Sequence, residues 1–358
     1  MISTGLYFAA GIILLLGGAH LLVSSSSTLA LRFGIPAIFI GVTIVAFATS
    51  APEIAVSLDA ILDGSASLAL GNVVGSNIAN ILLILGLSAA IKPIKVTRRV
   101  IWLDIPIMIL ASAVVYLLAL DERLQPLDGI IMLVLFAGFM IFQIQQARKS
   151  KNNKTNSDKG SDSTKTGSLL RQVVLLILGL ALLGLGAHWL VDSAIVLARI
   201  WGMSELIIGL TIVAIGTSLP ELATSVLAAG QNESDLSVGN VIGSNIFNLL
   251  LVLGISAFFS AEGLPISGAA LALDLPFMIA VSIACLPIFF TGHIIARWEG
   301  FVFIGYYAAY MLYLFLDATQ HEYLDLFNEV MIIFVAPITI FTLLVFAIRS
   351  WRKSGLQG

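Results

Sequence analysis

Residues 41–57 read GVTIVAFATSAPEIAVS, and residues 209–225 read GLTIVAIGTSLPELATS. Each stretch places Thr, Ser, Pro and Glu in the middle of an otherwise apolar segment. A carboxylate at the centre of a bilayer costs at least about 2.5 kcal/mol, so a matched glutamate in two apolar segments requires a common explanation. Glu53 and Glu221 are therefore the first candidates for functional groups.

The composition of the whole chain excludes a water-soluble fold. Hydrophobic residues make up 59% of the 358 residues and charged residues only 11%, whereas soluble domains contain about 25% charged residues. The net charge of −3 offers no basic surface for nucleic acid. A single cysteine excludes an intramolecular disulfide and a cysteine-based zinc or iron–sulfur cluster. We therefore predict a membrane protein that acts within the bilayer.

Apolar runs that could cross the membrane recur along the chain. A hydrocarbon core about 30 Å thick requires about 20 apolar residues per helix. We predict eleven such spans, at 5–23, 36–58, 68–90, 101–120, 127–146, 169–191, 206–229, 236–259, 269–290, 299–317 and 330–348. The first run carries neither the basic residues nor the cleavage site of a signal peptide, so we expect it to be retained. The predicted class is an all-α polytopic membrane protein.

The two halves of the chain are copies of each other. Residues 41–89 align with residues 209–257 at a constant offset of 168, and 27 of the 49 positions are identical. The similarity extends outward, for example from Ala19-His20 to Ala187-His188. Five spans in each copy are an odd number, so the second copy enters the membrane from the opposite face. We predict an inverted-topology repeat of 5+5 transmembrane helices plus an extra C-terminal helix.

A polar segment, RKSKNNKTNSDKGSDSTKTGS, separates the two copies and contains no residues able to form a core, which is typical of a flexible linker. Four segments are predicted: the first five-helix repeat (1–147), a flexible cytoplasmic linker (148–168), the second, inverted repeat (169–317), and an extracellular acidic loop with the eleventh helix and a cytoplasmic tail (318–358).

Basic residues predict the orientation of the chain in the membrane. Lys and Arg concentrate in cytoplasmic loops, and an amino terminus placed outside puts 16 of the 18 basic residues on the cytoplasmic side, leaving Arg123 and Arg199 outside. The carboxyl terminus is then cytoplasmic. We expect a multi-pass protein of the plasma membrane (the cell inner membrane).

Oxygen-bearing side chains line one face of each glutamate helix. Thr49, Glu53 and Ser57 are spaced four residues apart, which places them on one helix face. The second copy repeats this face with Thr217, Glu221 and Ser225. Pro52 and Pro220 each remove a backbone donor and crowd the carbonyl four residues earlier, so the turn near Ala48 and near Gly216 is expected to open. Open backbone at membrane depth predicts the wall of a cavity.

A second pair of blocks adds hydroxyl and amide groups. Residues 71–80 read GNVVGSNIAN, and residues 239–248 read GNVIGSNIFN. The pairs spaced four residues apart are Ser76 with Asn80 and Ser244 with Asn248. The remaining amides, which we expect to form hydrogen bonds between helices, are Asn72, Asn77, Asn240 and Asn245.

All of these groups are hard oxygen donors. Neither block contains His or Cys, so the donor set suits Ca²⁺, Na⁺ or Mg²⁺ better than copper or zinc. Ca²⁺ accepts six to eight oxygen ligands in flexible geometry, whereas Mg²⁺ demands a stricter octahedron. Two carboxylates balance one Ca²⁺ or two Na⁺, so these ions would compete for one site. Such competition is the minimum requirement for exchange.

The paired blocks resemble the two alpha-repeats of the sodium/calcium exchanger family, of the prokaryotic type, within the calcium/cation antiporter superfamily. The resemblance covers about the first 317 residues and implies secondary-active antiport of Na⁺ against Ca²⁺ by alternating access, in which the first helix of each repeat slides past a fixed core. The metal ligands that it implies by matching position are Ala46 (carbonyl), Thr49, Ser50, Glu53, Ser76, Asn80, Ala214 (carbonyl), Thr217, Ser218, Glu221, Ser244 and Asn248.

The resemblance implies Ca²⁺ and Na⁺ as transported substrates in the lipid bilayer. We expect no cofactor, catalytic residue or nucleic acid, and we infer no obligate protein partner. Several exchangers carry aspartate at one of the positions of Asn80 and Asn248, so this chain keeps two carboxylates where they have three. The proton-coupled branch usually places an acidic residue soon after its Gly-Asn pair, and neither copy here has one. This favours Na⁺, with a Ca²⁺/H⁺ exchanger as the alternative.

A cation channel is a further alternative, in which the same oxygens would line a continuous pore. An enzyme is not expected, because the sequence has no H-E-x-x-H motif, no protease-type aspartate pair and no serine with an adjacent histidine base. His20 and His188 are interpreted as buried structural residues, and Asp104 and Asp274 as caps near helix starts. Cys285 is interpreted as a small core residue.

Overall fold

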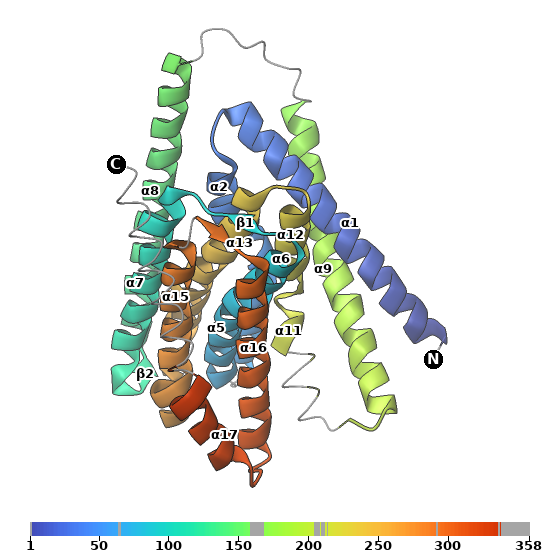
Figure 1. Ribbon diagram of the computed structural model, residues 1–358, viewed down its shortest axis with the longest axis vertical. Coiled ribbons are helices and arrows are strands. Elements are labelled where there is room, and N and C mark those ends of the chain that lie inside the picture. Colours follow the sequence, from blue (N-terminus) through green and yellow to red (C-terminus); the bar gives the residue numbers. More distant parts are fainter. Residues whose placement is uncertain are drawn as a thin grey trace.

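The computed structural model describes residues 2–63, 66–157, 168–203, 208, 212, 214–290, 293–335 and 337. Most of these residues are helical (Figure 1). In the first half the elements are α1 (Ile2–Phe33), α2 (Ala37–Ile40), η1 (Gly41–Val45), α3 (Ala46–Thr49), α4 (Ala51–Leu62), α5 (Ala66–Ala79), η2 (Asn80–Leu85), α6 (Gly86–Ile91), β1 (Ile94–Lys95), η3 (Val100–Asp104), α7 (Ile105–Leu118), η4 (Ala119–Asp121), β2 (Arg123–Leu124) and α8 (Pro126–Ser157).

The second half repeats much of this order. Its elements are α9 (Leu169–Ile200), α11 (Ala214–Gly216), α12 (Leu219–Gly230), α13 (Ser234–Phe247), η6 (Asn248–Val252), α14 (Leu253–Phe259), β3 (Leu264–Pro265), η7 (Ala270–Asp274), α15 (Leu275–Phe290), β4 (Ile294–Ile295), α16 (Arg297–Ala318), α17 (Leu324–Val330) and η8 (Met331–Val335). The elements η1, η2, η3, η6, η7 and η8 are π-helical turns, and η4 is a 3₁₀ turn.

Eight helical segments of the described residues are long and apolar enough to cross a membrane. They are Ser3–Phe33, Ala37–Leu62, Leu68–Ile91, Val100–Asp121, Pro126–Lys151, Leu169–Ile200, Ser234–Phe259 and Arg297–Ala318, with a shorter apolar helix at Ala270–Leu286. The predicted class of helical membrane protein is confirmed. Parts of the predicted spans 206–229 and 330–348 lie outside the described residues, so the number of helices per repeat stays a prediction.

Helix α8 extends past the point at which the linker was expected to begin. The helix continues through Ser157, whereas the predicted linker started at residue 148. The physical reason is local: Arg148, Lys149, Lys151 and Lys154 are good helix formers, and adding residues to an existing helix is easier than nucleating a new one. Residues 158–167 of the predicted linker lie outside the described residues.

The two halves are interlocked through backbone contacts at glycine. Gly300 of α16 packs on α6, where a Cβ at Gly300 would meet the Gly86 carbonyl oxygen at 2.5 Å. In the other half, a Cβ at Gly129 of α8 would meet the Gly254 carbonyl oxygen at 2.7 Å. Two short antiparallel strand pairs, β1 with β4 and β2 with β3, also join the halves. Each half therefore contributes a late helix that packs on an early helix of the other.

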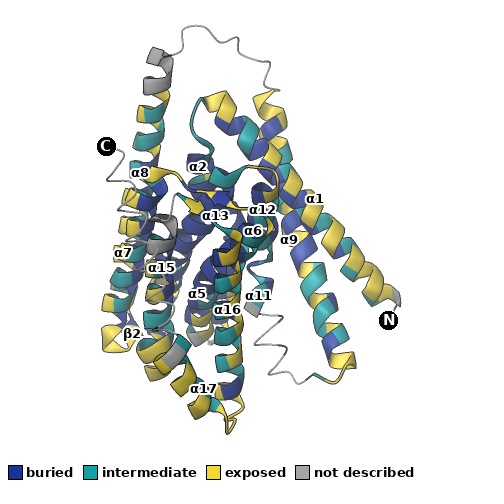
Figure 2. Ribbon diagram, in the orientation of Figure 1, coloured by how far each residue is buried: buried dark blue, intermediate teal, exposed yellow. Residues whose placement is uncertain are grey.

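The most buried helices form the centre of the molecule. In Figure 2 the buried residues concentrate on α5, α13 and their neighbours, while the outward faces of α1, α8 and α9 are exposed. Buried residues make up 83% of the most apolar window in Ser234–Phe259 but only 22% in Leu169–Ile200. The central helices are the ones that carry the paired sequence blocks.

We expect Gly300→Ala to destabilise the protein by about 1–3 kcal/mol, because the added methyl group must displace the backbone of α6. Gly305→Ala is the matched control, since a Cβ at Gly305 of the same helix meets nothing within 4 Å and alanine favours helix formation. Thermal unfolding in detergent measures the difference. Equal melting temperatures for the two variants would contradict the close packing of α16 on α6.

Candidate cation site

Glu53 and Glu221 occupy the first turns of α4 and α12, and both side chains are 0% exposed. Each helix begins after a break at serine, where Ser50 has φ −79° and ψ 3° and Ser218 has φ −85° and ψ 6°. The proline at the second helical position has no N–H to donate and fits the start of a helix. The sequence therefore breaks the helix directly before each glutamate.

The broken turns place backbone carbonyls beside the hydroxyl groups. The Ala46 carbonyl accepts hydrogen bonds from the Ser50 N–H at 3.0 Å and from the Thr49 hydroxyl at 3.4 Å. In the second copy the Ser218 N–H donates to the Ile215 carbonyl at 3.1 Å. Ala214 is the first residue of α11. Ala48 and Gly216 remain helical, within α3 and α11, so the expected opening is confined to Ser50 in the first copy and to Thr217 and Ser218 in the second.

Glu53 lies among groups from both halves of the chain. The Ser76 hydroxyl, from α5, donates to Glu53 Oε1 at 3.5 Å. Ser218, which precedes α12, lies beside the same carboxylate, and the charge of Glu221 repels that of Glu53. The two acids predicted from sequence are therefore brought together.

Glu221 has the equivalent surroundings. The Ser50 hydroxyl donates to Glu221 Oε1 at 3.4 Å, and Thr49 and Ser244 lie next to this carboxylate. The Thr49 and Ser244 hydroxyl oxygens are 3.3 Å apart. Each acid is consequently surrounded by hydroxyl groups of its own repeat and of the other.

Asparagine side chains hold the helices around the acids. Asn72 donates to the Ser57 hydroxyl at 3.0 Å, and the Thr217 hydroxyl donates to Asn72 Oδ1 at 3.3 Å. The second copy repeats this pattern with Asn240, which donates to Ser225 at 2.9 Å and accepts from Thr49 at 3.1 Å. The predicted hydrogen bonds between helices are therefore present, and Thr217 is oriented by one of them.

Asn80 and Asn248 are fully buried at the first residues of the π-helical turns η2 and η6. Asn80 Nδ2 donates to Asn245 Oδ1 at 2.9 Å, and Asn77 Nδ2 donates to the Asn245 carbonyl at 3.2 Å. π-Helical turns are frequent at functional sites, and the matched pair was not predicted. Only the Gly-Ser-Asn repetition signalled these positions, because the residues that follow are apolar on every side of the helix and show no shift in pattern.

Several buried oxygen atoms near the two acids have no hydrogen-bond partner in the described structure. They are Glu53 Oε2, Glu221 Oε2, Asn80 Oδ1, Asn248 Oδ1 and Ser218 Oγ. All belong to residues predicted as ligands. Among the described residues neither glutamate forms a salt bridge, and no group of three His, Cys, Asp or Glu side chains is present. A cation bound here would therefore be held by two carboxylates together with neutral oxygens.

Two sets of residues outside the site differ from expectation. Asp104 does not cap its helix. Instead it forms an ion pair with Arg99 at 3.2 Å and accepts a hydrogen bond from Gln143 at 3.0 Å. Because this carboxylate is 0% exposed, a charged partner stabilises it more than a helix terminus would. Asp274 accepts a hydrogen bond from Tyr310. His20 and His188 are exposed rather than buried: His20 lies beside Gln231 at the end of α12, and His188 pairs with Asp192 of its own helix. Cys285 is buried, as expected.

Comparison with known proteins relates both halves of the chain to one family. A family model described as sodium/calcium exchanger protein matches residues 3–145 and 171–316. Inner membrane protein YrbG of Escherichia coli (strain K12) is 41% identical over 278 residues, covering 76% of this chain and 84% of that protein. Sodium/calcium exchanger MaX1 of Methanosarcina acetivorans is 34% identical over 341 residues, covering 85% and 96%.

The fold agrees with that of a solved membrane protein. A structure of the sodium-calcium exchanger NCX_Mj, soaked with Na⁺ and Sr²⁺, superimposes with a TM-score of 0.74 at 32% sequence identity. The match covers 87% of this chain and 99% of that chain. The likeness therefore extends over both repeats.

Glu53→Gln and Glu221→Gln should each weaken Ca²⁺ binding at least about 30-fold, because a buried charge interaction is lost. Without Ca²⁺ both variants should melt at higher temperature than the wild type, since a buried unpaired charge is removed. Ca²⁺ should raise the melting temperature of the wild type but not of the variants. Binding of ⁴⁵Ca²⁺ and thermal unfolding of purified protein measure both effects.

The control for these variants is Glu122→Gln, which removes the same charge at an exposed residue. It should bind Ca²⁺ like the wild type. If either glutamine variant kept wild-type affinity, its glutamate would not be a ligand.

Proposed function

Because the chain belongs to the sodium/calcium exchanger protein family, we propose that it exchanges Na⁺ for Ca²⁺ across the plasma membrane by alternating access. Family membership makes the chain a multi-pass cation/Ca²⁺ antiporter, in a family of transporters and not of enzymes. The resemblance seen in the paired sequence blocks is thereby confirmed. Sodium as the counter-ion, the ligand set and the orientation are our proposals.

The observation that carries the proposal is the pair of fully buried carboxylates, which have no cationic side chain as partner among the residues that the structure describes. Burial of an ionised carboxylate costs several kcal/mol unless a charge and hydrogen bonds compensate it. Here the side-chain groups beside the carboxylates are hydroxyls, and one oxygen of each glutamate has no partner in the described structure. The site is therefore built to attract cations.

The charge and donor set suit ions that exchange with each other. Two carboxylates neutralise one Ca²⁺ or two Na⁺, and neutral oxygens from Thr49, Ser50, Ser76, Ser218 and Ser244 lie beside them. We propose these residues as ligands together with Asn80, Asn248 and Thr217 and the carbonyls of Ala46 and Ala214. Because both ions require the same carboxylates, binding of one expels the other. This is the coupling that antiport needs.

We also propose that the amino terminus lies outside the cell and the carboxyl terminus in the cytoplasm, as the distribution of basic residues favours. The name of a relative, inner membrane protein YrbG, agrees with a location in the cell inner membrane. Whichever way the chain is oriented, Na⁺ entering down its gradient would drive Ca²⁺ out.

Transport in proteoliposomes tests the proposal. Vesicles loaded with Na⁺ and diluted into Na⁺-free buffer should accumulate ⁴⁵Ca²⁺, whereas vesicles with equal Na⁺ on both sides should not. Glu53→Gln should abolish accumulation, and Glu122→Gln should leave it unchanged. The ionophore monensin, which dissipates the Na⁺ gradient, should stop uptake.

Two outcomes would contradict Na⁺/Ca²⁺ exchange. Uptake driven by a pH step and indifferent to Na⁺ would assign the chain as a Ca²⁺/H⁺ exchanger. Uptake that follows the membrane potential without any counter-ion would assign it as a channel.

A further inference from the structure

Helices α1 and α9 form a unit distinct from the rest of the molecule, and they run together along one side of it (Figure 1). They pack backbone to backbone: a Cβ at Gly18 would meet the Gly179 carbonyl oxygen at 2.6 Å, and a Cβ at Gly186 would meet the Leu15 N at 2.5 Å. Their buried apolar residues belong to a cluster that is separate from the main core and that also includes residues of α2, η1, α12 and α13. The close backbone contacts make α1 and α9 one rigid pair.

Two polar contacts join α1 to the end of α12. The His20 ring Nδ1 lies 3.0 Å from Gln231 Nε2, and the Ser27 hydroxyl donates to Glu233 Oε1 at 2.7 Å. His20 and Ser27 are seven residues apart, so they lie on one face of α1. Gln231 directly follows the helix that begins with Glu221 in its first turn. These contacts therefore connect the α1–α9 pair to a helix of the cation site.

The inverted repeat has matching residues at the opposite end of the molecule. With the offset of 168, His188 corresponds to His20, and Asp63 corresponds to Gln231. Lys92, at the far end of the Leu68–Ile91 segment from Asp63, donates to the Gly230 carbonyl. Asp63 and Gln231 therefore lie at opposite ends of a segment about 36 Å long.

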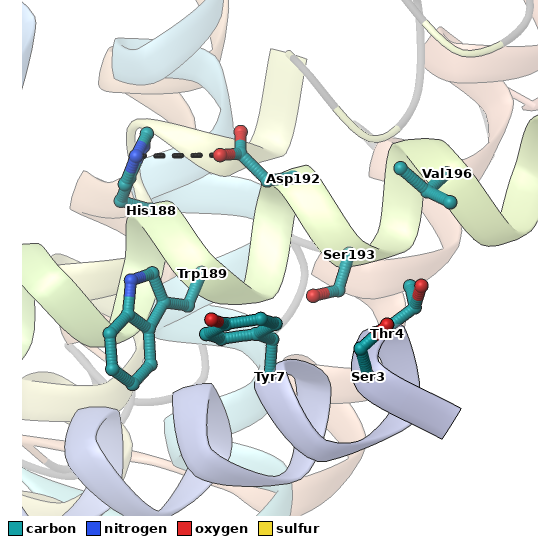
Figure 3. Close-up of a pocket in the computed structure, with 8 residues that line it drawn as sticks. All are labelled: Ser3, Thr4, Tyr7, His188, Trp189, Asp192, Ser193 and Val196. Carbon is teal, nitrogen blue, oxygen red and sulfur yellow. Dashed lines mark ion pairs between the residues drawn. The ribbon is translucent and has the colours of Figure 1, made fainter. Parts of the chain in front are cut away.

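At the Asp63 end the equivalent contact is not made. His188 is 68% exposed and pairs with Asp192 of its own helix at 3.4 Å, as Figure 3 shows. These two residues line a pocket of about 480 Å³ between α1 and α9, together with Tyr7 and Trp189. The Asp63 side chain is exposed. The α1–α9 pair is thus fastened to the main body by its histidine at the Gln231 end.

We propose that His20 and Gln231, with Ser27 and Glu233, form a latch that closes one end of the ion pathway, and that His188 and Asp63 form the corresponding latch at the other end. The latches alternate: when the α1–α9 pair shifts, the first opens and His188 leaves Asp192 for Asp63. The proposal rests on the alternating access of the proposed function. It assigns positioning roles to residues that touch no ion.

Cysteine crosslinking tests the proposal in a Cys285→Ala background, where the one native thiol, which is buried, has been removed. Proteins with His20→Cys/Gln231→Cys or His188→Cys/Asp63→Cys are treated in proteoliposomes with a short bis-methanethiosulfonate, which a reductant reverses. Both pairs should crosslink during exchange. Each crosslink should stop ⁴⁵Ca²⁺ flux, and reduction should restore it.

The pair Trp201→Cys/Asp63→Cys is the control for crosslinks that form by nonspecific encounters. Trp201 is exposed and directly follows α9, about 20 Å beyond His188. This pair should not crosslink. Absence of the His188→Cys/Asp63→Cys crosslink in protein that is exchanging Ca²⁺ would overturn the proposal, as would undiminished flux through crosslinked protein.

A second measurement tests the first latch without placing cysteines in it. His20→Ala should raise the yield of the His188→Cys/Asp63→Cys crosslink about 3- to 10-fold, because loss of one hydrogen bond favours the opposite state. A residue with only a structural role would lower stability without changing this yield, and an unchanged yield would overturn the proposal. Crosslinking does not depend on which ion is exchanged, so proton coupling would refute Na⁺/Ca²⁺ exchange and leave this test intact.

Discussion

The structure depends on two carboxylates, those of Glu53 and Glu221, which are buried within the membrane-spanning helices and lie close enough for their charges to interact. Neither glutamate has a salt-bridge partner among the described residues, and their charges repel. A fold that keeps such a pair must supply rigid surroundings, and it does so with asparagines that link the glutamate helices to α5 and α13. The packing of the central helices therefore holds the two carboxylates together against their repulsion, and a bound cation would relieve that repulsion.

Duplication explains how one site obtains matched ligands. Glu53 is approached by Ser218 and Glu221 by Ser50, so each repeat supplies groups to the acid of the other. A site that lies between two inverted copies can be reached from either face by equivalent movements. The most buried segments, such as Ser234–Phe259, carry proposed ligands, whereas α1 and α9, which we propose to move, are lightly buried.

The sequence predicted the fold and the two acids because both leave strong local signals. Apolar runs of about 20 residues predict spans, and the pairing of Glu53 with Glu221 follows from a gapless repeat. The π-helical turns at Asn80 and Asn248 leave no such signal, since they change the backbone without changing the apolar pattern. One partner of Asp104 is Gln143, on a distant helix that local spacing cannot identify. The exposure of His20 depends on which face of α1 meets its neighbours, which a uniformly apolar helix does not reveal.

The interlocked glycine contacts have a consequence for biosynthesis. Gly86 lies early in the chain and Gly300 late, so the ribosome delivers the first of these residues long before its partner. The nascent first half must wait in the membrane with that surface facing lipid. Native assembly is complete only when α16 has been inserted. Insertion of this late helix of the second half therefore completes the packing of the first half.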